Sequence, residues 1–233
     1  MKTHSRLAFV ACSIFFASPL CLAQDTDQLW NKAQAHNQSL KHLVPRNVQT
    51  ANQSYDGQNQ LHNSTEVIEV FKGFDDQHPV RAARLITHNN PIHPSQQISA
   101  LFPNPVLEGA EFGLPATRHH QPVGQTTIDG SVCRIFAFDG NDDGMEFIGR
   151  AWVDQTSGML RKVEYRLQTR PGQLIRAGSF ATDYDAQGRP VQARSDFTIA
   201  GTAAPVRHLA QHQWDEWAVL ENARPTTQVA TVR

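Results

Sequence analysis

The pattern of apolar and polar residues along the chain predicts one helix near the start. In residues 25–43, apolar positions recur every three or four residues, which is the spacing of one helical face. Leu29 and Leu40 belong to this face, and Asp25 is suited to cap the start of the helix. Pro45 is expected to end it. A helix with one apolar face packs that face against another element, so we expect Asp25–Leu43 to cover a sheet.

Ten strands are predicted after the helix, in a group of three and a group of seven. The first group covers residues 47–55, 60–72 and 80–88, and Asp56-Gly57 marks a hairpin turn within it. The second group covers residues 123–128, 132–139, 145–154, 159–169, 174–184, 190–199 and 206–217. Short connections force neighbouring strands to pair antiparallel, so the second group should form a meander that twists and curls.

Alternation within the second group predicts a sheet with one apolar face and one wet face. Val163 alternates with Lys162 and Glu164, for example, and such a sheet must cover its apolar face. The residues predicted to line a ligand groove on the concave face are Val163, Tyr165, Leu167, Phe197, Ile199, Phe147, Ala151, Val153 and Phe180. Trp152 is expected to face outward or to pack under a loop. Aromatic residues gather in these strands, which fits an ordinary core as well as an acyl-chain groove.

Residues 79–122 have a different character, because they hold seven of the 13 prolines. Proline at this density interrupts both strand ladders and helices. A long irregular crossing of this kind is either a functional lid or a plain surface loop, and both interpretations stay open. The residues expected to form a lid over the concave face are Leu29 and Leu40 of the helix with Leu101 and Phe102 of the crossing. One helix and one crossing are little cover for a large sheet. The sheet therefore either closes into a barrel or stays half open over an apolar groove.

The start of the chain has the pattern of a signal peptide. Lys2 and Arg6 precede an apolar stretch from Leu7 to Ala17, and Ala23 is a small residue suited to cleavage before Gln24. We therefore expect residues 1–23 to be a signal peptide, residues 24–220 a single domain and residues 221–233 a flexible tail. Two of the 3 cysteines precede Gln24, which leaves only Cys133 and no internal disulfide. The expected location is the periplasm.

A recurring hairpin carries a resemblance to a known family. The stretch Gly149–Gly158 reads G-R-A-W-V-D-Q-T-S-G, and Val163-Glu164-Tyr165-Arg166 and Pro171-Gly172 follow it. This order resembles the LolA-like and LolB-like periplasmic carriers that sort lipoproteins to the outer membrane. The resemblance implies an incomplete antiparallel barrel whose apolar concave face is covered by helices and receives lipoprotein acyl chains.

Motifs of enzymes and of metal sites give no competing prediction. The sequence has no H-E-x-x-H, no G-x-S-x-G and no glycine-rich phosphate loop. His208 and His212 share one face of a predicted strand, but four residues along a strand span ~13 Å, too far for one metal ion. The formal net charge of −1 argues against a nucleic-acid partner.

The leading hypothesis is a non-catalytic carrier that shields a lipid or lipoprotein acyl chain. It needs no cofactor, makes transient contact with a membrane, and acts as a monomer. The alternative is an envelope protein-interaction or sensor module that uses an open sheet edge or the lid to hold a protein partner. A hydrolase with an unrecognised site ranks last.

Overall fold

The computed structural model of the chain describes residues 19–40, 43–75, 78–88, 113–142, 145–169, 175–199 and 206–219. Within these ranges lie one helix, α1 (Pro19–Ser39), and ten strands. The strands are β1 (Leu43–Tyr55), β2 (Leu61–Asp75), β3 (His78–His88), β4 (Thr117–Ile128), β5 (Ser131–Asp142), β6 (Met145–Asp154), β7 (Leu160–Thr169), β8 (Ile175–Tyr184), β9 (Pro190–Ile199) and β10 (Val206–Val219). The ten strands predicted from the sequence are all present.

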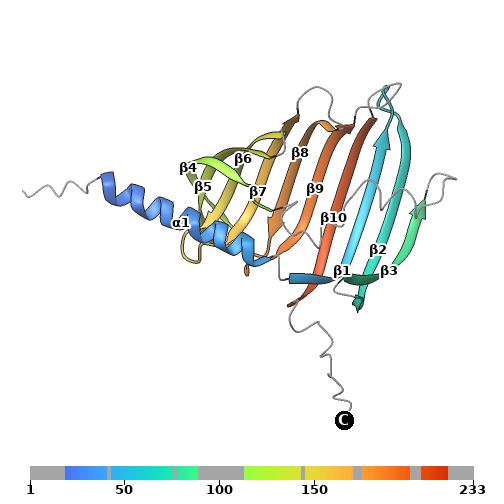
Figure 1. Cartoon of the computed structure of the whole chain (residues 1–233), viewed down its shortest axis with the longest axis horizontal. Helices are drawn as coiled ribbons and strands as arrows, with labels where there is room; N and C mark the ends of the chain where they lie inside the picture. Colours follow the sequence, from blue (N-terminus) through green and yellow to red (C-terminus); the bar gives the residue numbers. More distant parts are fainter. Residues whose placement is uncertain are drawn as a thin grey trace, which may run out of the picture.

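All ten strands belong to one curved antiparallel sheet (Figure 1). Its strand order is β3-β2-β1-β10-β9-β8-β7-β6-β5-β4, so β3 and β4 are its edges and the barrel stays open. The strands β4 to β10 form the predicted meander. The first three strands join it because β1 pairs with β10, with Thr50 opposite His212. The predicted fold class, a mainly β half-open barrel with an N-terminal helix, is confirmed.

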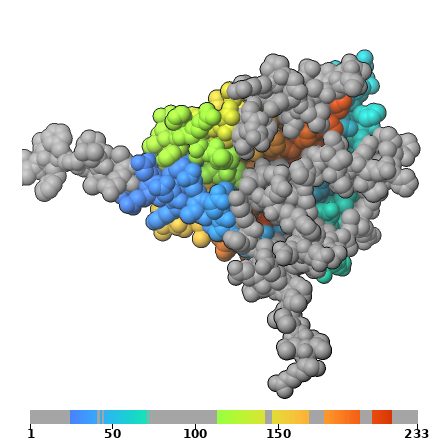
Figure 2. Space-filling view, in the orientation of Figure 1, coloured from blue at the N-terminus to red at the C-terminus, as the bar shows by residue number. Residues whose placement is uncertain are grey.

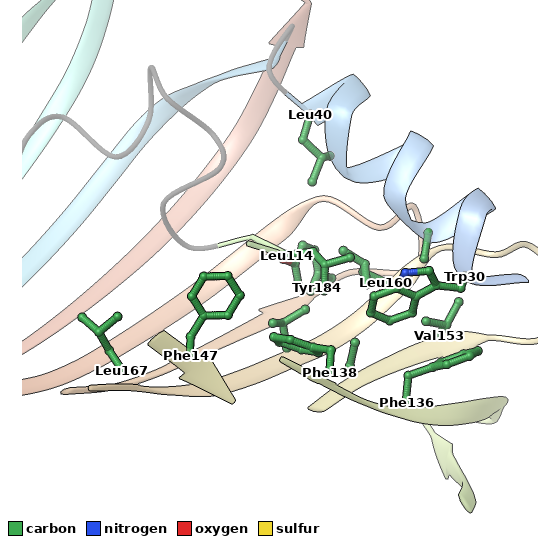
Figure 3. Close-up of a cluster of buried hydrophobic side chains, with 13 residues drawn as sticks. Trp30, Leu40, Leu114, Phe136, Phe138, Phe147, Val153, Leu160, Leu167 and Tyr184 are labelled. Carbon is green, nitrogen blue, oxygen red and sulfur yellow. The ribbon is translucent and has the colours of Figure 1, made fainter. Parts of the chain in front are cut away.

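Helix α1 lies on one face of the sheet, which we call the inner face. In the space-filling view, α1 lies against the residues of β4 (Figure 2). Trp30 and Ala33 of α1, and Leu40 directly after its end, are buried and belong to one apolar cluster with residues of β5 to β8 (Figure 3). The strand residues of this cluster are Phe136, Phe138, Phe147, Ala151, Val153, Leu160, Val163, Leu167 and Tyr184. Full burial of a large apolar side chain stabilises a fold by about 1.5–3 kcal/mol, so this cluster holds α1 in place.

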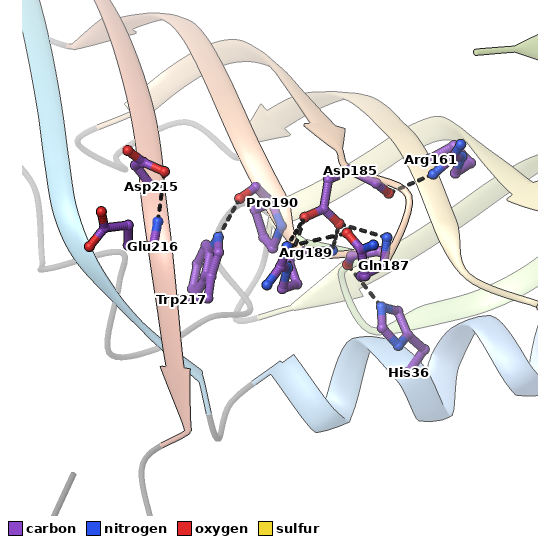
Figure 4. Close-up of polar contacts among 10 residues, drawn as sticks. His36, Arg161, Asp185, Gln187, Arg189, Pro190, Asp215, Glu216 and Trp217 are labelled. Atoms are coloured by element: carbon purple, nitrogen blue, oxygen red, sulfur yellow. Dashed lines mark hydrogen bonds and ion pairs between the residues drawn. The ribbon is translucent and has the colours of Figure 1, made fainter. Parts of the chain in front are cut away.

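Two hairpin turns of the sheet contact α1 and support it. In the turn between β6 and β7 the Asp154 carboxylate accepts backbone N–H bonds, and Asp185 does the same between β8 and β9 (Figure 4). Each turn ends on a glycine with positive φ, Gly158 at 77° and Gly188 at 72°. A Cβ at Gly158 would crowd Lys32, and one at Gly188 would overlap the His36 ring, so both turns touch α1.

Hydrogen bonds and one ring stack hold α1 on the sheet. His36 Nε2 lies 2.8 Å from the carbonyl oxygen of Gly188. The buried Asn37 side chain donates to the Leu114 carbonyl oxygen and accepts from the Leu114 N–H, both at 3.0 Å. Nearer its start, Trp30 stacks on His120 of β4 with ring centroids 4.7 Å apart. These contacts place α1 over β4 to β8. No helix among the described residues is long and apolar enough to cross a membrane.

The predicted end of the helix is wrong. α1 ends at Ser39, Leu43 is the first residue of β1, and Pro45 lies within β1. Proline is tolerated there because pairing with β2 begins only at Asn47, so Pro45 has a partner strand on one side alone. Leu43 still packs against the apolar cluster, as the helical spacing suggested, although it does so from a strand.

The predicted irregular crossing at residues 79–122 is shorter than expected. β3 takes up its first residues, and β4 begins at Thr117 instead of the predicted Val123. Pro79 and Pro122 both fit because they lie in edge strands, where one side of the backbone needs no partner. The register also shifts between Pro122 and Gly124, as at a β-bulge. The predicted lid residues Leu101 and Phe102 lie outside the described residues.

Replacing Gly188 tests the contact between α1 and the turn that joins β8 to β9. Gly188→Ala adds a methyl group against His36, whereas Gly130→Ala adds one at a similar φ of 80° where nothing lies within 4 Å. Both variants suffer the left-handed strain of about 1–2 kcal/mol. We expect Gly188→Ala to lower the free energy of unfolding by about 1–3 kcal/mol more than Gly130→Ala, measured by urea denaturation. Equal losses would mean that α1 does not depend on this turn.

Candidate functional site

The inner face consists of rows of side chains that cross the strands. Residues opposite one another in neighbouring strands share a row. One row follows Phe138, Gly149, Tyr165, Phe180, Ser195, Ala210 and Asn52. The next follows Phe147, Leu167, Gly178, Phe197, His208 and Ser54. The face is therefore apolar on β5 to β8 and becomes polar toward β10 and β1.

The predicted groove residues fall into two sets on this face. Those beneath α1 are buried in the apolar cluster, namely Phe147, Ala151, Val153, Val163 and Leu167. Tyr165 and Phe180 are half-buried at the edge of the cluster, and Phe197 is buried further along in β9. Ile199 ends β9, and its side chain lies outside the described residues. The predicted lid residues Leu29, in α1, and Leu40, directly after its end, pack on the same cluster, with Leu40 buried and Leu29 half-buried.

An aromatic border, which we define as Tyr165, Phe180 and Phe197, marks the change from apolar to polar. Tyr165 and Phe180 stack with ring centroids 5.0 Å apart and planes 16° apart. Phe147 meets Tyr165 edge-on at 6.3 Å, which connects the border to the cluster under α1. Phe197 stacks on His208 at 5.4 Å. Tyr165 and Phe180 thus extend the apolar surface beyond the cluster under α1, and Phe197 adds a ring further along in β9.

The polar half of the inner face contains a buried histidine. His212 Nδ1 lies 3.1 Å from the hydroxyl oxygen of Thr50, across the junction of β10 and β1. Burial lowers the pKa of His212 to about 4, because the charged imidazolium loses its hydration there. Burial also lowers the pKa of His208 on the same strand. Burial therefore favours the neutral form of both imidazoles, which makes these two side chains polar without charge at pH 7.

The described residues offer a ligand apolar surface on the inner face and charge on the outer face. No group of three or more His, Cys, Asp or Glu side chains in the described ranges is placed to hold a metal ion. The Cys133 thiol is buried, and burial raises its pKa. Trp152 lies opposite Lys162, whose ammonium nitrogen is 5.4 Å from the centre of the indole ring. This pair belongs to the outer face, as the sequence predicted for Trp152.

Sequence reasoning missed three features of the molecule. Trp30 is buried in the contact between α1 and the sheet, although it lies outside the apolar positions of the helical spacing. Phe136 and Phe138 alternate within β5, and this signal was sufficient to add them to the concave face. A trough on the outer face was also missed, because it is lined by six strands whose order no local pattern encodes.

Comparison with known proteins gives similar folds among solved structures. A LolA superfamily protein from Nitrosomonas europaea is 13% identical, over 83% of this chain and 92% of that chain, with a TM-score of 0.34. A DUF1329 family protein from Desulfovibrio piger is 10% identical over the same shares, also with a TM-score of 0.34. A domain described as an outer membrane lipoprotein-sorting protein from Vibrio parahaemolyticus is 9% identical over 84% and 91%, with a TM-score of 0.29. No family model and no curated protein sequence matches the chain.

The buried imidazole of His212 predicts a specific loss of stability in acid. The unfolded state binds a proton below pH 6.5, whereas folded His212 resists protonation until about pH 4. Stability should therefore fall as the pH drops from 6.5 to 4, by about 2–3 kcal/mol from this residue. Urea unfolding at pH 7 and pH 4.5 should show a smaller loss in His212→Gln than in the wild type. The exposed His62→Gln serves as control, and if both variants match the wild type the histidine is not buried as neutral imidazole.

Proposed function

We propose that this chain is a non-catalytic binding and carrier protein that shields an acyl chain of a lipid or lipoprotein on its inner face. The observation that supports the proposal is the cover of that face. One helix covers the apolar half, and half-buried Tyr165 and Phe180 continue the apolar surface beyond it. An acyl chain would replace part of this cover and lie along the same surface.

The energetics of the cover support reversible exchange. The cover contributes two large buried apolar side chains, Trp30 in α1 and Leu40 directly after its end, and Leu29 of α1 is half-buried. Exposing these side chains costs roughly 5–8 kcal/mol on the usual transfer scale. Each methylene buried in their place returns about 0.8 kcal/mol, so roughly six to ten methylenes balance the displacement. An acyl chain of about sixteen carbons therefore has apolar surface to spare for displacing α1, whereas one of about eight carbons only balances the cost.

The aromatic border gives the acyl chain a route onto the apolar part of the inner face. Tyr165 contacts Phe147, which lies in the cluster beneath α1, so the apolar surface is continuous from the border inward. Aromatic rings supply broad apolar area at low conformational cost, which suits a ligand without directional groups. The acyl chain would enter beside Phe180 and move toward Phe147 and Leu167 as α1 lifts from its turns. The proposal also includes export to the periplasm with loss of residues 1–23, action as a monomer, and transient contact with a membrane that supplies the lipid.

Lipid uptake by delipidated protein tests the border. We expect a fluorescent analogue of a sixteen-carbon fatty acid to bind, and Phe180→Asp to weaken its binding tenfold or more, because a carboxylate is placed against the chain. Ser179→Asp is the matched control, since Ser179 is the exposed neighbour on the opposite face. An eight-carbon analogue should bind at least tenfold more weakly than the sixteen-carbon one, because it buries about half as many methylenes. If Phe180→Asp folds normally and binds as well as Ser179→Asp, the inner face is not the lipid site. Capture of a protein by a sample that takes up no lipid would favour the interaction-module alternative.

Locking α1 tests whether it is the cover that moves. Gln34 Nε2 donates to Thr117 Oγ1 at 3.2 Å, which makes this pair suited to cysteine substitution and a short reducible cross-linker. We expect the cross-linked Gln34→Cys/Thr117→Cys protein to lose uptake of the sixteen-carbon analogue and to regain it after reduction. The same double variant without cross-linker is the control. Uptake that persists in the cross-linked protein would contradict displacement of α1.

A further inference from the structure

A trough of about 980 Å³ runs across the outer face of the sheet, on the side opposite α1. It crosses β6, β7, β8, β9, β10 and β1, which are consecutive neighbours in the sheet. Its floor contains small side chains, including Ala51, Ser179 and Ala181. The trough has two lining residues in common with the edge of the apolar cluster, Tyr165 and Phe180. Its charged side chains, such as Arg150 and Arg166, lie outside that cluster.

The lining of the trough has an excess of positive charge. Its cations are Arg150, Lys162, Arg166 and Arg194, and its carboxylates are Glu164 and Asp196. Both carboxylates are already paired, Glu164 with Lys162 at 2.6 Å and Asp196 with Arg207 at 2.6 Å. The whole chain has a net charge of −1, so this positive excess is local.

Two arginines of the trough have no ion-pair partner among the described residues and can therefore pair with a ligand. Arg194 pairs with Asp183 at 3.3 Å, but neither Arg150 nor Arg166 has a carboxylate within 4.0 Å among the described residues. Arg150 and Arg166 lie on the neighbouring strands β6 and β7. A guanidinium group presents a planar fork of donors that matches a carboxylate in two parallel hydrogen bonds. The free arginines therefore select carboxylates.

The size and shape of the trough fit an extended peptide. From β6 to β1 there are five steps between strands, which span about 24 Å at the usual strand spacing. About seven residues of extended chain cover that distance. At the β6 end lies Ile148, opposite Arg166 and 70% exposed, which offers an apolar contact next to the charged ones. A flat bilayer surface would touch the rim of such a trough and leave its floor uncovered.

We propose that the outer trough binds an extended acidic polypeptide segment of a partner protein, laid across the strands. Carboxylates of the segment pair with Arg150 and Arg166, and an apolar side chain packs on Ile148. Attraction between the local positive charge and the acidic segment speeds encounter and weakens with salt. This docking surface does not depend on acyl-chain binding at the inner face.

The test uses the full chain and a fluorescein-labelled peptide of about seven alternating glutamate and leucine residues, a length set by the strand spacing. We expect saturable binding that weakens strongly between low and high salt. Arg150→Glu/Arg166→Glu should weaken it tenfold or more. The control Arg46→Glu/Arg118→Glu changes the net charge equally at exposed positions outside the trough, and should bind within about twofold of the wild type. Arg150→Lys/Arg166→Lys keeps the charge and should lie between the two.

Three results would overturn the proposal. They are no binding of the acidic peptide, equal loss in the two glutamate variants, and binding to anionic vesicles that the trough variant abolishes while peptide binding is unaffected. Uptake of the sixteen-carbon fatty acid should be unchanged in Arg150→Glu/Arg166→Glu. Failure of peptide binding is therefore distinguishable from failure of the lipid-carrier function.

Discussion

The pairing of β1 with β10 is the interaction on which the rest of the structure depends. It joins a three-stranded group to a seven-stranded meander, and makes a single ten-stranded sheet of them. The hydrogen bond between Thr50 and His212 crosses this junction between residues 162 positions apart. Both candidate surfaces extend toward it, because the inner rows run on into β1 and the outer trough includes Ala51 and Gln53. Without this pairing, the meander would end in an exposed edge at β10.

The position of α1 follows from the two hairpin turns more than from the helix itself. Glycine at positions 158 and 188 lets the turns approach the helix closely, and the aspartates at positions 154 and 185 hold the turn backbones rigid. This gives the motif of the recurring hairpin a physical role, since its final glycine is a contact point for the covering helix. A helix held by a few large side chains and by polar contacts at its ends keeps apolar surface dry and remains separable from it.

The two faces of the sheet differ because side chains alternate along each strand. On β7, Val163 and Leu167 are buried beneath α1, while Lys162 and Glu164 pair on the other face. The inner face is apolar and neutral, which suits a ligand without charge along its length. The outer face has arginines in excess, which suits a carboxylate-rich ligand. One sheet can therefore serve two partners of different chemistry, one on each face.

Local pattern in the sequence was sufficient for the ten strands and for the facing of residues such as Val163, Tyr165 and Trp152, because period-two alternation is a property of each strand alone. The hairpin turns were visible for the same reason. The tertiary structure alone decided that β1 pairs with β10, because backbone hydrogen bonds between strands do not depend on which residues form them. It also decided that Pro45 and Pro122 lie in strands, since a proline is tolerated only where a neighbouring strand is absent. The burial of Val163 and Leu167 under α1, and the meeting of Arg150 and Arg166 in one trough, depend on packing and strand order, which no single segment of the chain encodes.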